Sequence, residues 1–109
     1  MIRGTTPDYL LTIPGYDLTE CTIYVTVKQS LQLVTLDNER LSVSLEDEAT
    51  YISFRLTQSE TLKFKPGDAE IQVRFIDSDG LALATETGHI QIMPVLLEKV
   101  IEYDEPGTD

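Results

Sequence analysis

Residues 70–93 decide the fold of this chain, and they run Glu70-Ile71-Gln72-Val73-Arg74-Phe75-Ile76-Asp77-Ser78-Asp79-Gly80-Leu81-Ala82-Leu83-Ala84-Thr85 and, after a short gap, His89-Ile90-Gln91-Ile92-Met93. The apolar residues Ile71, Val73 and Phe75 alternate with polar ones, which is the period of a strand with one face in a core. Asp77 to Gly80 are residue types that tolerate tight or left-handed backbone. A second apolar run follows at once. The stretch therefore predicts a β-hairpin at the centre of a sheet.

The same alternation recurs along the rest of the 109 residues. Further strands are predicted at 9–13, 21–28, 31–36, 41–45 and 51–56. Spacings of about 8–12 residues with short connections are typical of antiparallel sandwiches and barrels. We predict an all-β fold, an antiparallel β-sandwich of seven or eight short strands. It forms one domain over residues 1–102, and an acidic, disordered tail follows over residues 103–109.

Two segments depart from the strand pattern. Thr57 is predicted to cap a single helical turn, with Glu60 three residues later as its capping-box partner. Residues 95–101 are apolar and follow Pro94, and they fit a final edge strand or a short helix. We favour the extended form, because Pro94 and the β-branched pair Val100-Ile101 disfavour so short a helix.

Composition excludes several classes of partner. The chain has 8 basic and 19 acidic residues, a net charge of −11. Nucleic acid and anionic membrane surfaces both require a basic footprint, so neither is an expected partner. The acidity favours solubility or docking to a basic protein. The first residues lack the apolar core of a signal peptide and no apolar run is long enough for a membrane span, so we expect synthesis in the cytoplasm without membrane insertion.

No arrangement of residues predicts catalysis or a metal site. Cys21 and His89 are the single cysteine and histidine, so neither an internal disulfide nor a zinc site within the chain is expected. Cys21 is in phase with the apolar residues that follow it, which predicts a buried, inert thiol. The Asp77–Gly80 turn lacks the remaining ligands of a calcium loop and is interpreted as a hairpin turn whose carboxylates accept bonds from its own amides. We therefore expect a non-enzymatic protein without cofactors.

Interaction surfaces are the remaining source of function. Tyr24 is predicted on the exposed phase of its strand. Val34, Leu36, Leu96 and Leu97 belong to segments that are apolar on both phases. Such segments either are covered by other parts of the chain or contact a partner chain. These five residues are the candidate partner contacts.

Three segments carry a resemblance to a family. They are the lead-in Met1-Ile2-Arg3-Gly4-Thr5-Thr6-Pro7 with the strand ending at Ile13-Pro14, the segment Leu56-Thr57-Gln58-Ser59-Glu60-Thr61-Leu62-Lys63-Phe64, and the hairpin residues 70–74 and 79–84. Together they resemble small prophage-encoded proteins of Gram-positive gut bacteria. The resemblance implies a phage structural component, associated with the tail or baseplate and incorporated in the virion. Its implied partners are tail or baseplate proteins, or further copies of itself in a homo-oligomer.

The corner at 56–62 also resembles the turn before the sixth strand of immunoglobulin-type sandwiches, although the cysteine pair and core tryptophan of antibody domains are missing. The resemblance implies an Ig-like architecture and says nothing of immune function. An alternative function stays open. The chain would then be a soluble adaptor or ligand-binding module for a carbohydrate or a basic peptide, with Tyr16, Tyr24, Tyr51 and the acidic loops as its contacts.

Overall fold

Two antiparallel β-sheets make up the computed structural model, which describes residues 1–103. The strands are β1 (Asp8–Pro14), β2 (Thr22–Gln29), β3 (Gln32–Leu36), β4 (Ser42–Glu46), β5 (Ala49–Arg55), β6 (Gly67–Ile76), β7 (Ala82–Ala84) and β8 (Gly88–Ile92). One helical turn, α1 (Gln58–Leu62), and a 3₁₀ turn, Asn38–Arg40, complete the regular elements. Of the tail predicted at 103–109, all but exposed Tyr103 lies outside the described residues.

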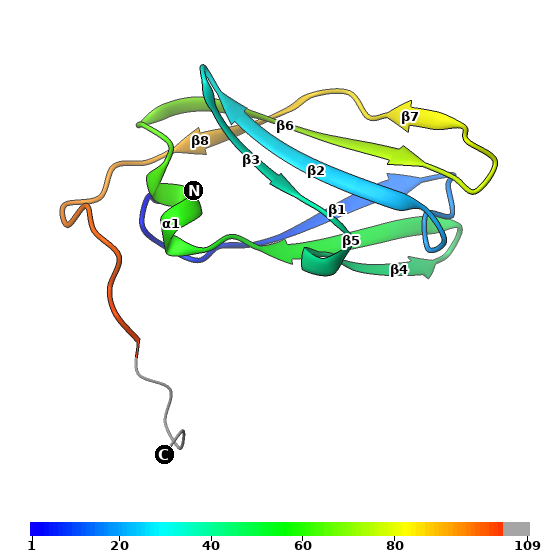
Figure 1. Ribbon diagram of the computed structural model, residues 1–109, viewed down its shortest axis with the longest axis horizontal. Helices are drawn as coiled ribbons and strands as arrows, with labels where there is room; N and C mark the ends of the chain where they lie inside the picture. The colour runs from blue at the N-terminus through cyan, green and yellow to red at the C-terminus, as the bar shows by residue number, and fades with distance from the viewer. Residues whose placement is uncertain (104–109) are drawn as a thin grey trace, which may run out of the picture.

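The two sheets pack face to face (Figure 1). The β1 sheet has the order β1-β5-β4, and the β2 sheet has the order β3-β2-β6, with both β7 and β8 paired along the far side of β6. This is the immunoglobulin arrangement, in which strands B, E and D face strands C′, C, F and G. In that correspondence β1 is strand B, β6 is strand F, and β7 with β8 is a divided strand G. The predicted all-β, antiparallel, Ig-like sandwich is confirmed.

Alternation along the strands builds the core. On β2, Ile23, Val25 and Val27 are buried while the residues between them face outward. On β5 the even-numbered residues Thr50, Ile52 and Phe54 are buried in the same way. Removing apolar surface from water on this scale is the main stabilising term for such a domain.

The hairpin predicted at 70–93 is present, with one difference. Its first arm, β6, lies between β2 and the pair β7 and β8, so it is an interior strand as expected. Its return arm is divided at residues 85–87 and forms an edge of the sheet. In the turn, the Asp77 carboxylate accepts hydrogen bonds from the amides of Asp79 and Leu81, both at 2.9 Å, which confirms the predicted hairpin turn.

The connection from β4 to β5 is tighter than its acidic sequence suggests. Glu46 pairs with Ala49, so only two residues form the turn. Asp47 and Glu48 have φ angles of 49° and 64°. Positive φ at both central residues is the signature of a type I′ turn, whose twist matches that of the flanking strands. Non-glycine residues adopt this conformation at a cost in conformational energy.

The helical corner forms as predicted. The Thr57 hydroxyl accepts from the Glu60 amide at 3.1 Å, and the Glu60 carboxylate accepts from the Thr57 amide at 2.8 Å. This reciprocal capping box satisfies two amides that would otherwise have no partner. Phe64, just after α1, is fully buried and anchors the corner to the core.

The prediction of a final strand at 95–101 is wrong, because this segment forms neither strand nor helix. The chain leaves β8, passes α1 and extends away from the sandwich (Figure 1). Its backbone has no neighbouring strand. The Gln58 side chain of α1 bonds to the backbone of Ile101 instead, accepting from its amide and donating to its carbonyl. No helix among residues 1–103 is long and apolar enough to cross a membrane.

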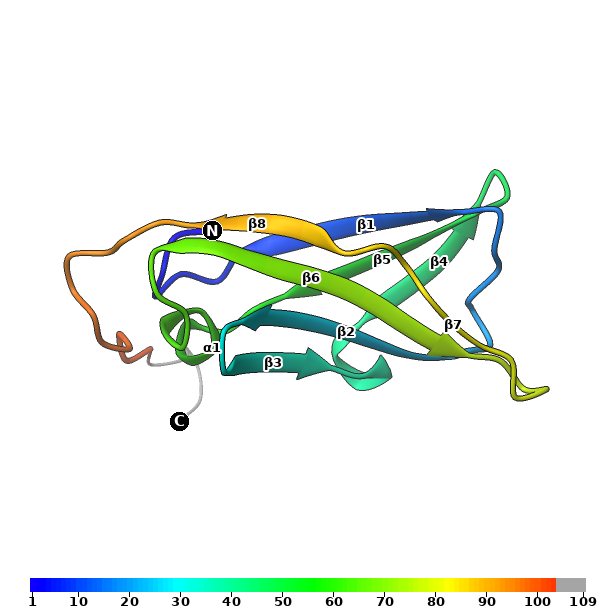
Figure 2. The ribbon, with the colours of Figure 1, turned by 90° about the horizontal axis from the view of Figure 1, so that it is seen from above.

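No described strand lies where strand A of an immunoglobulin sheet would pair with strand B. The N-terminal residues reach the other sheet instead. Ile2 forms a parallel bridge with Met93, and the amide of Met93 donates to the carbonyl of Met1 at 2.7 Å. Without a strand A, β1 is the edge strand of its sheet. It lies on the same side of the sandwich as β8, which is at the edge of the other sheet (Figure 2).

Candidate interaction surfaces

One edge of β1 has no pairing strand in the described structure. At the two ends of β1, the Leu56 amide donates to the carbonyl of Pro7, and the Gly15 amide donates to the carbonyl of Glu48. Odd-numbered residues of β1 therefore point their peptide groups toward β5. By the alternation of an antiparallel ladder, the peptide groups of residues 8, 10 and 12 point outward. An unpaired strand edge of this kind is a template for another strand.

An apolar groove of about 540 Å³ adjoins this edge, between the two sheets. Its walls come from β1, from β6, and from the segment that divides β7 from β8. The lining residues are Leu11, Thr12, Ile13, Pro14, Tyr16, Ile71, Gln72, Val73, Thr85, Glu86 and Gly88. Glu86 is the single charged residue among them. The groove lies where an additional strand beside β1 would place its inward side chains.

Thr85 closes the β6 edge inside the groove. Its amide donates to the Val73 carbonyl at 2.9 Å, and its hydroxyl accepts from the Val73 amide at 3.1 Å. The Gln72 side chain donates to the Thr85 carbonyl at 2.9 Å. The β6 backbone is thus satisfied at the break in strand G, which leaves β1 as the unsatisfied wall. Gly88 lets the returning chain approach closely, since a Cβ there would lie 3.2 Å from the Ile71 side chain.

Tyr16 forms a fixed end wall. Its carbonyl accepts from the hydroxyl of buried Thr50 at 2.6 Å, and the same hydroxyl accepts from the Leu18 amide at 3.0 Å. The Tyr16 ring packs edge to face on Phe75 with centroids 5.8 Å apart. A wall held by a buried hydroxyl and an aromatic contact is arranged before any partner arrives, which lowers the entropy cost of binding.

Two of the five predicted contact residues are not on the surface. Val34 and Leu36 are 3% and 1% exposed, so the prediction that they meet a partner is wrong. The register of β3 on β2 explains the error, because it places them opposite Val27 and Val25 on the core face. The apolar residue that β3 does expose is Leu33.

Tyr24 is on the outer face of the β2 sheet, as predicted, with 46% of its surface exposed. Beside it are Arg74, Ile76 and Ala82, which line a hollow of about 380 Å³ together with threonines of β2 and β3. The lining mixes apolar side chains with an arginine and three threonines. Contact with a partner through Tyr24 stays a prediction.

Leu96 and Leu97 are exposed, as partner contacts must be, and they belong to a longer apolar segment. From residue 96 to residue 103 every side chain is exposed. Val100 and Ile101 extend the apolar character beyond the two leucines. Their contact with a partner also stays a prediction.

The tyrosines of the alternative ligand-binding hypothesis do not share a surface. Tyr16 lines the groove. Tyr24 is outside the β2 sheet, and Tyr51 is on the outward phase of β5, outside the β1 sheet. A carbohydrate site needs several such groups around one ligand, and the structure does not bring these three together.

Cys21 and His89 are also far apart. The residue after Cys21 pairs with Ile76 at one end of β6, whereas His89 pairs with Glu70 toward the other end. Burial, with a smaller contribution from nearby carboxylates, raises the pKa of the Cys21 thiol, which keeps it protonated and unreactive at neutral pH. Cys21 is only half-buried, however, and not fully buried as predicted. A hydrogen bond to Asp68 at 2.8 Å raises the pKa of exposed His89.

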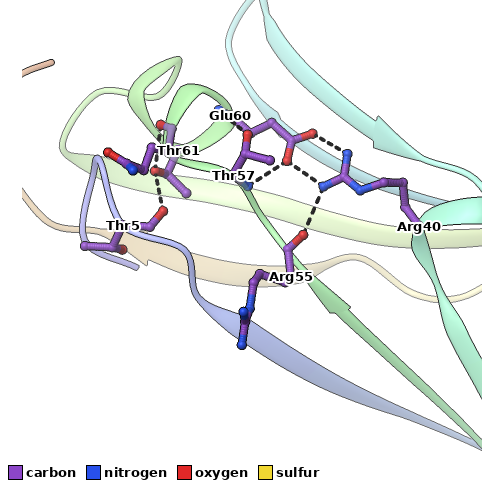
Figure 3. A network of polar contacts seen from close by, with 7 residues as sticks. Thr5, Arg40, Arg55, Thr57, Glu60 and Thr61 are labelled. Atoms are coloured by element: carbon purple, nitrogen blue, oxygen red, sulfur yellow. Dashed lines mark hydrogen bonds and ion pairs between the residues drawn. The ribbon is translucent and has the colours of Figure 1, made fainter. Parts of the chain in front are cut away.

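A polar network joins the two sheets at the α1 corner (Figure 3). Arg40, from the 3₁₀ turn between β3 and β4, donates to both carboxylate oxygens of Glu60 at 2.8 and 3.1 Å. It also donates to the carbonyl of Arg55 at 3.0 Å. The hydrogen bonds from Arg40 are the main cause that holds the pKa of Glu60 below its ordinary value. The Thr61 hydroxyl donates to the carbonyl of Thr5 and ties the lead-in to the same corner.

No known family model matches the chain, and no curated protein is similar to it. Among solved structures, that of murine CRIg is similar over 87% of this chain and 89% of that chain, with 13% sequence identity and a TM-score of 0.36. The assignment of the fold therefore rests on the strand order and pairing described above.

Sequence reasoning did not identify the β1 edge or the groove. Both depend on the pairing of segments more than 30 residues apart, as between β1 and β5. One local signal was available. Pro7 precedes β1 and Pro14 is its last residue, and proline in strands is confined to sheet edges and strand ends.

Proposed function

We propose that the chain is a non-enzymatic module that acts through protein–protein contacts, as a structural or assembly component of a phage or prophage particle. The observation that carries the contact function is the unpaired β1 edge beside a preformed apolar groove. A strand edge offers backbone hydrogen bonds to an incoming segment, and the adjoining pocket selects its side chains. The assignment to a phage particle is supported by the resemblance of the lead-in, corner and hairpin segments to prophage proteins.

Charge narrows the kind of partner. With a net charge of −11, the molecule attracts basic or locally basic surfaces, and moderate salt screens its repulsion of acidic ones, which include further copies of itself. The groove adds one carboxylate, Glu86, to walls that are otherwise apolar or neutral. A partner segment that combines apolar residues with a single positive charge is complementary to it.

The particle assignment is tested in the bacterium that carries the gene. Prophage induction, purification of particles on a density gradient and mass spectrometry should find the chain at a fixed ratio to the tail proteins. The control is the same gradient from a strain with the gene deleted. Repeated absence of the chain from intact particles would overturn the assignment to a particle component.

The contact function is tested separately on the intact particle. Cross-linking of the intact particle, followed by peptide mapping, should place β1 or the groove within linker reach of another chain. Cross-links confined to other faces would show that the contacts run elsewhere.

A further inference from the structure

We propose that residues 95–101 of one copy add as an extra strand to the β1 edge of a second copy. This inference rests on the proposed function, because it names the partner of the same edge. The β1 edge has no pairing strand, and residues 95–101 have the sequence of a strand but no sheet edge to pair with. Each supplies what the other lacks.

The donor segment has the properties of an unpaired strand. Residues 95–101 are rich in branched apolar residues, and their sequence favours extended backbone. Beyond half-buried Val95, the side chains of the segment are exposed. Its polar attachments to the body are the Gln58 hydrogen bonds to Ile101 and an ion pair between Arg3 and Glu98. Few contacts must therefore break before the segment can move.

The acceptor edge lacks a strand at the corresponding place. The outward peptide groups of residues 8, 10 and 12 can exchange hydrogen bonds with an added strand, and Pro14 ends the available edge. Leu11 and Ile13 turn their side chains inward beside the groove and are only half-buried. An added strand would cover them in the way that strand A covers strand B of an immunoglobulin sheet.

Charge fixes which phase of the donor faces inward. Alternate donor residues point to one side of the strand. Leu97, Lys99 and Ile101 share one phase, and Lys99 is the only cation in the segment. With this phase turned inward, two apolar side chains enter the groove and Lys99 is placed toward Glu86. The opposite phase would direct Glu98 toward the same carboxylate, which is repulsive.

The resulting contact is heterologous, because the donor and the acceptor are different parts of the molecule. Such contacts close into rings or continue as open filaments. The donor emerges from the α1 end of the sandwich, and β1 ends at the opposite end (Figure 1). Pro14, the last residue of β1, lines the groove there. Copies would therefore join head to tail.

The test uses sedimentation velocity of the full chain over a range of concentrations at moderate salt. Wild-type protein should form a concentration-dependent series of oligomers. Thr12→Pro removes an outward amide without removing a bond to β5, and it should weaken assembly about tenfold or more. Thr12→Val keeps the amide and serves as the matched control. Leu97→Asp should weaken assembly to a similar extent, whereas Leu31→Asp, an equal change at an exposed leucine on the β2–β3 turn, should not.

A second measurement uses a labelled peptide of residues 94–103 as the probe, with fluorescence anisotropy as the readout. The peptide should bind wild-type chain, and the same peptide with Lys99→Glu should bind about tenfold more weakly or less. Binding should be lost in Thr12→Pro. Circular dichroism and thermal melts of each variant show whether the acceptor remains folded.

Three results would overturn the inference. The first is a strict monomer at all concentrations together with no binding of the peptide. The second is assembly that Thr12→Pro and Leu97→Asp leave unchanged. The third is a concentration-independent pairing of 95–101 with β1 of the same copy, seen by amide exchange. None of them removes the proposed function, which fails only if the chain is absent from particles and the edge contacts no other protein there.

Discussion

The α1 corner and the β1 edge are built on opposite principles. At the corner, the polar side chains of Arg40, Thr57 and Glu60 all have partners, and the carboxylate of Glu60 accepts bonds from two separate groups. At the edge, the outward peptide groups of β1 face no strand, and an apolar groove lies beside them. The polar network at the corner connects the two sheets, whereas at the β1 edge a groove separates them.

This difference separates stability from recognition. A satisfied network resists change, because removing one member leaves a desolvated partner behind. An unsatisfied edge costs little while it is wet and gains hydrogen bonds when it is covered. Substitutions in the core and at the corner should therefore change the free energy of unfolding, and substitutions on the outer side of the edge should change binding alone.

The largest expected effect comes from Val73→Asp, which places a charge in the core beneath the groove. Val73 is 3% exposed. Burying an unpaired carboxylate should cost at least about 4 kcal/mol, a large share of the stability of a small domain. Ile76→Asp, three residues along the same strand on its exposed phase, is the control. Urea unfolding of both variants measures the difference, and equal midpoints would show that the faces of β6 are assigned incorrectly.

Glu60→Ala tests the corner. The substitution removes the capping box and the partner of Arg40 together. We expect a loss of about 2 kcal/mol, most of it from the cap, since Arg40 is partly exposed and solvent screens the ion pair. Glu39→Ala, a carboxylate on the neighbouring 3₁₀ turn that accepts no such bonds, should stay within about 0.5 kcal/mol of wild type. A loss at Glu60 no greater than at Glu39 would contradict the stabilising role of the corner.

The same carboxylate gives a pH dependence of known sign. The pKa of Glu60 lies below its ordinary value of 4.5 in the folded chain, chiefly because Arg40 donates to it. Its contribution to stability is therefore complete above about pH 4.5 and is lost as the pH falls through the lowered pKa. The difference in unfolding free energy between wild type and Glu60→Gln should be largest near pH 6 and should shrink below pH 4. A difference that grows toward acid would reverse the assigned sign.

The smallest effect is expected at His89, beside the groove end of β8. Asp68 raises its pKa above the ordinary 6.5, so its contribution is complete below that value and is lost as the pH rises through the raised pKa. As the only histidine, it gives a single imidazole signal in an NMR titration. Asp68→Asn should lower the measured pKa toward 6.5. An unchanged pKa would show that the pair does not form in solution.

The sequence predicted what is local. Alternation located the observed strands to within about three residues, the largest difference being the start of β6 at Gly67 where residue 70 was predicted, and the Thr57–Glu60 pair predicted the capping box. The Asp77 turn was predicted by residue types that bond their own backbone. In each of these cases the determining contacts lie within a few residues of one another, where pattern and chemistry act together.

What the sequence did not predict depends on pairing over long distances. The segment of Val34 and Leu36 is apolar on both phases, a pattern that fits partner contact as well as burial, and only the register with β2 decides which phase is inside. Residues 95–101 have strand propensity, but a strand requires a neighbour and the described structure provides none. The free edge of β1 follows from the strand order, which no local pattern records.

The pairing of β1 with β5 has a consequence for how the chain is made. Each hairpin forms between strands that are a few residues apart in the sequence. The partner of β1, in contrast, begins about 40 residues after β1 does, and Asp8 pairs with Arg55 across 47 positions. At synthesis rates of roughly 5–20 residues per second, that interval lasts about 2–9 s. For this time the backbone of β1 has no strand to pair with. Folding dominated by such distant pairings is also slow, on the millisecond to second scale. β1, an edge strand of the finished molecule, is thus also the strand that waits longest for its first pairing partner during synthesis.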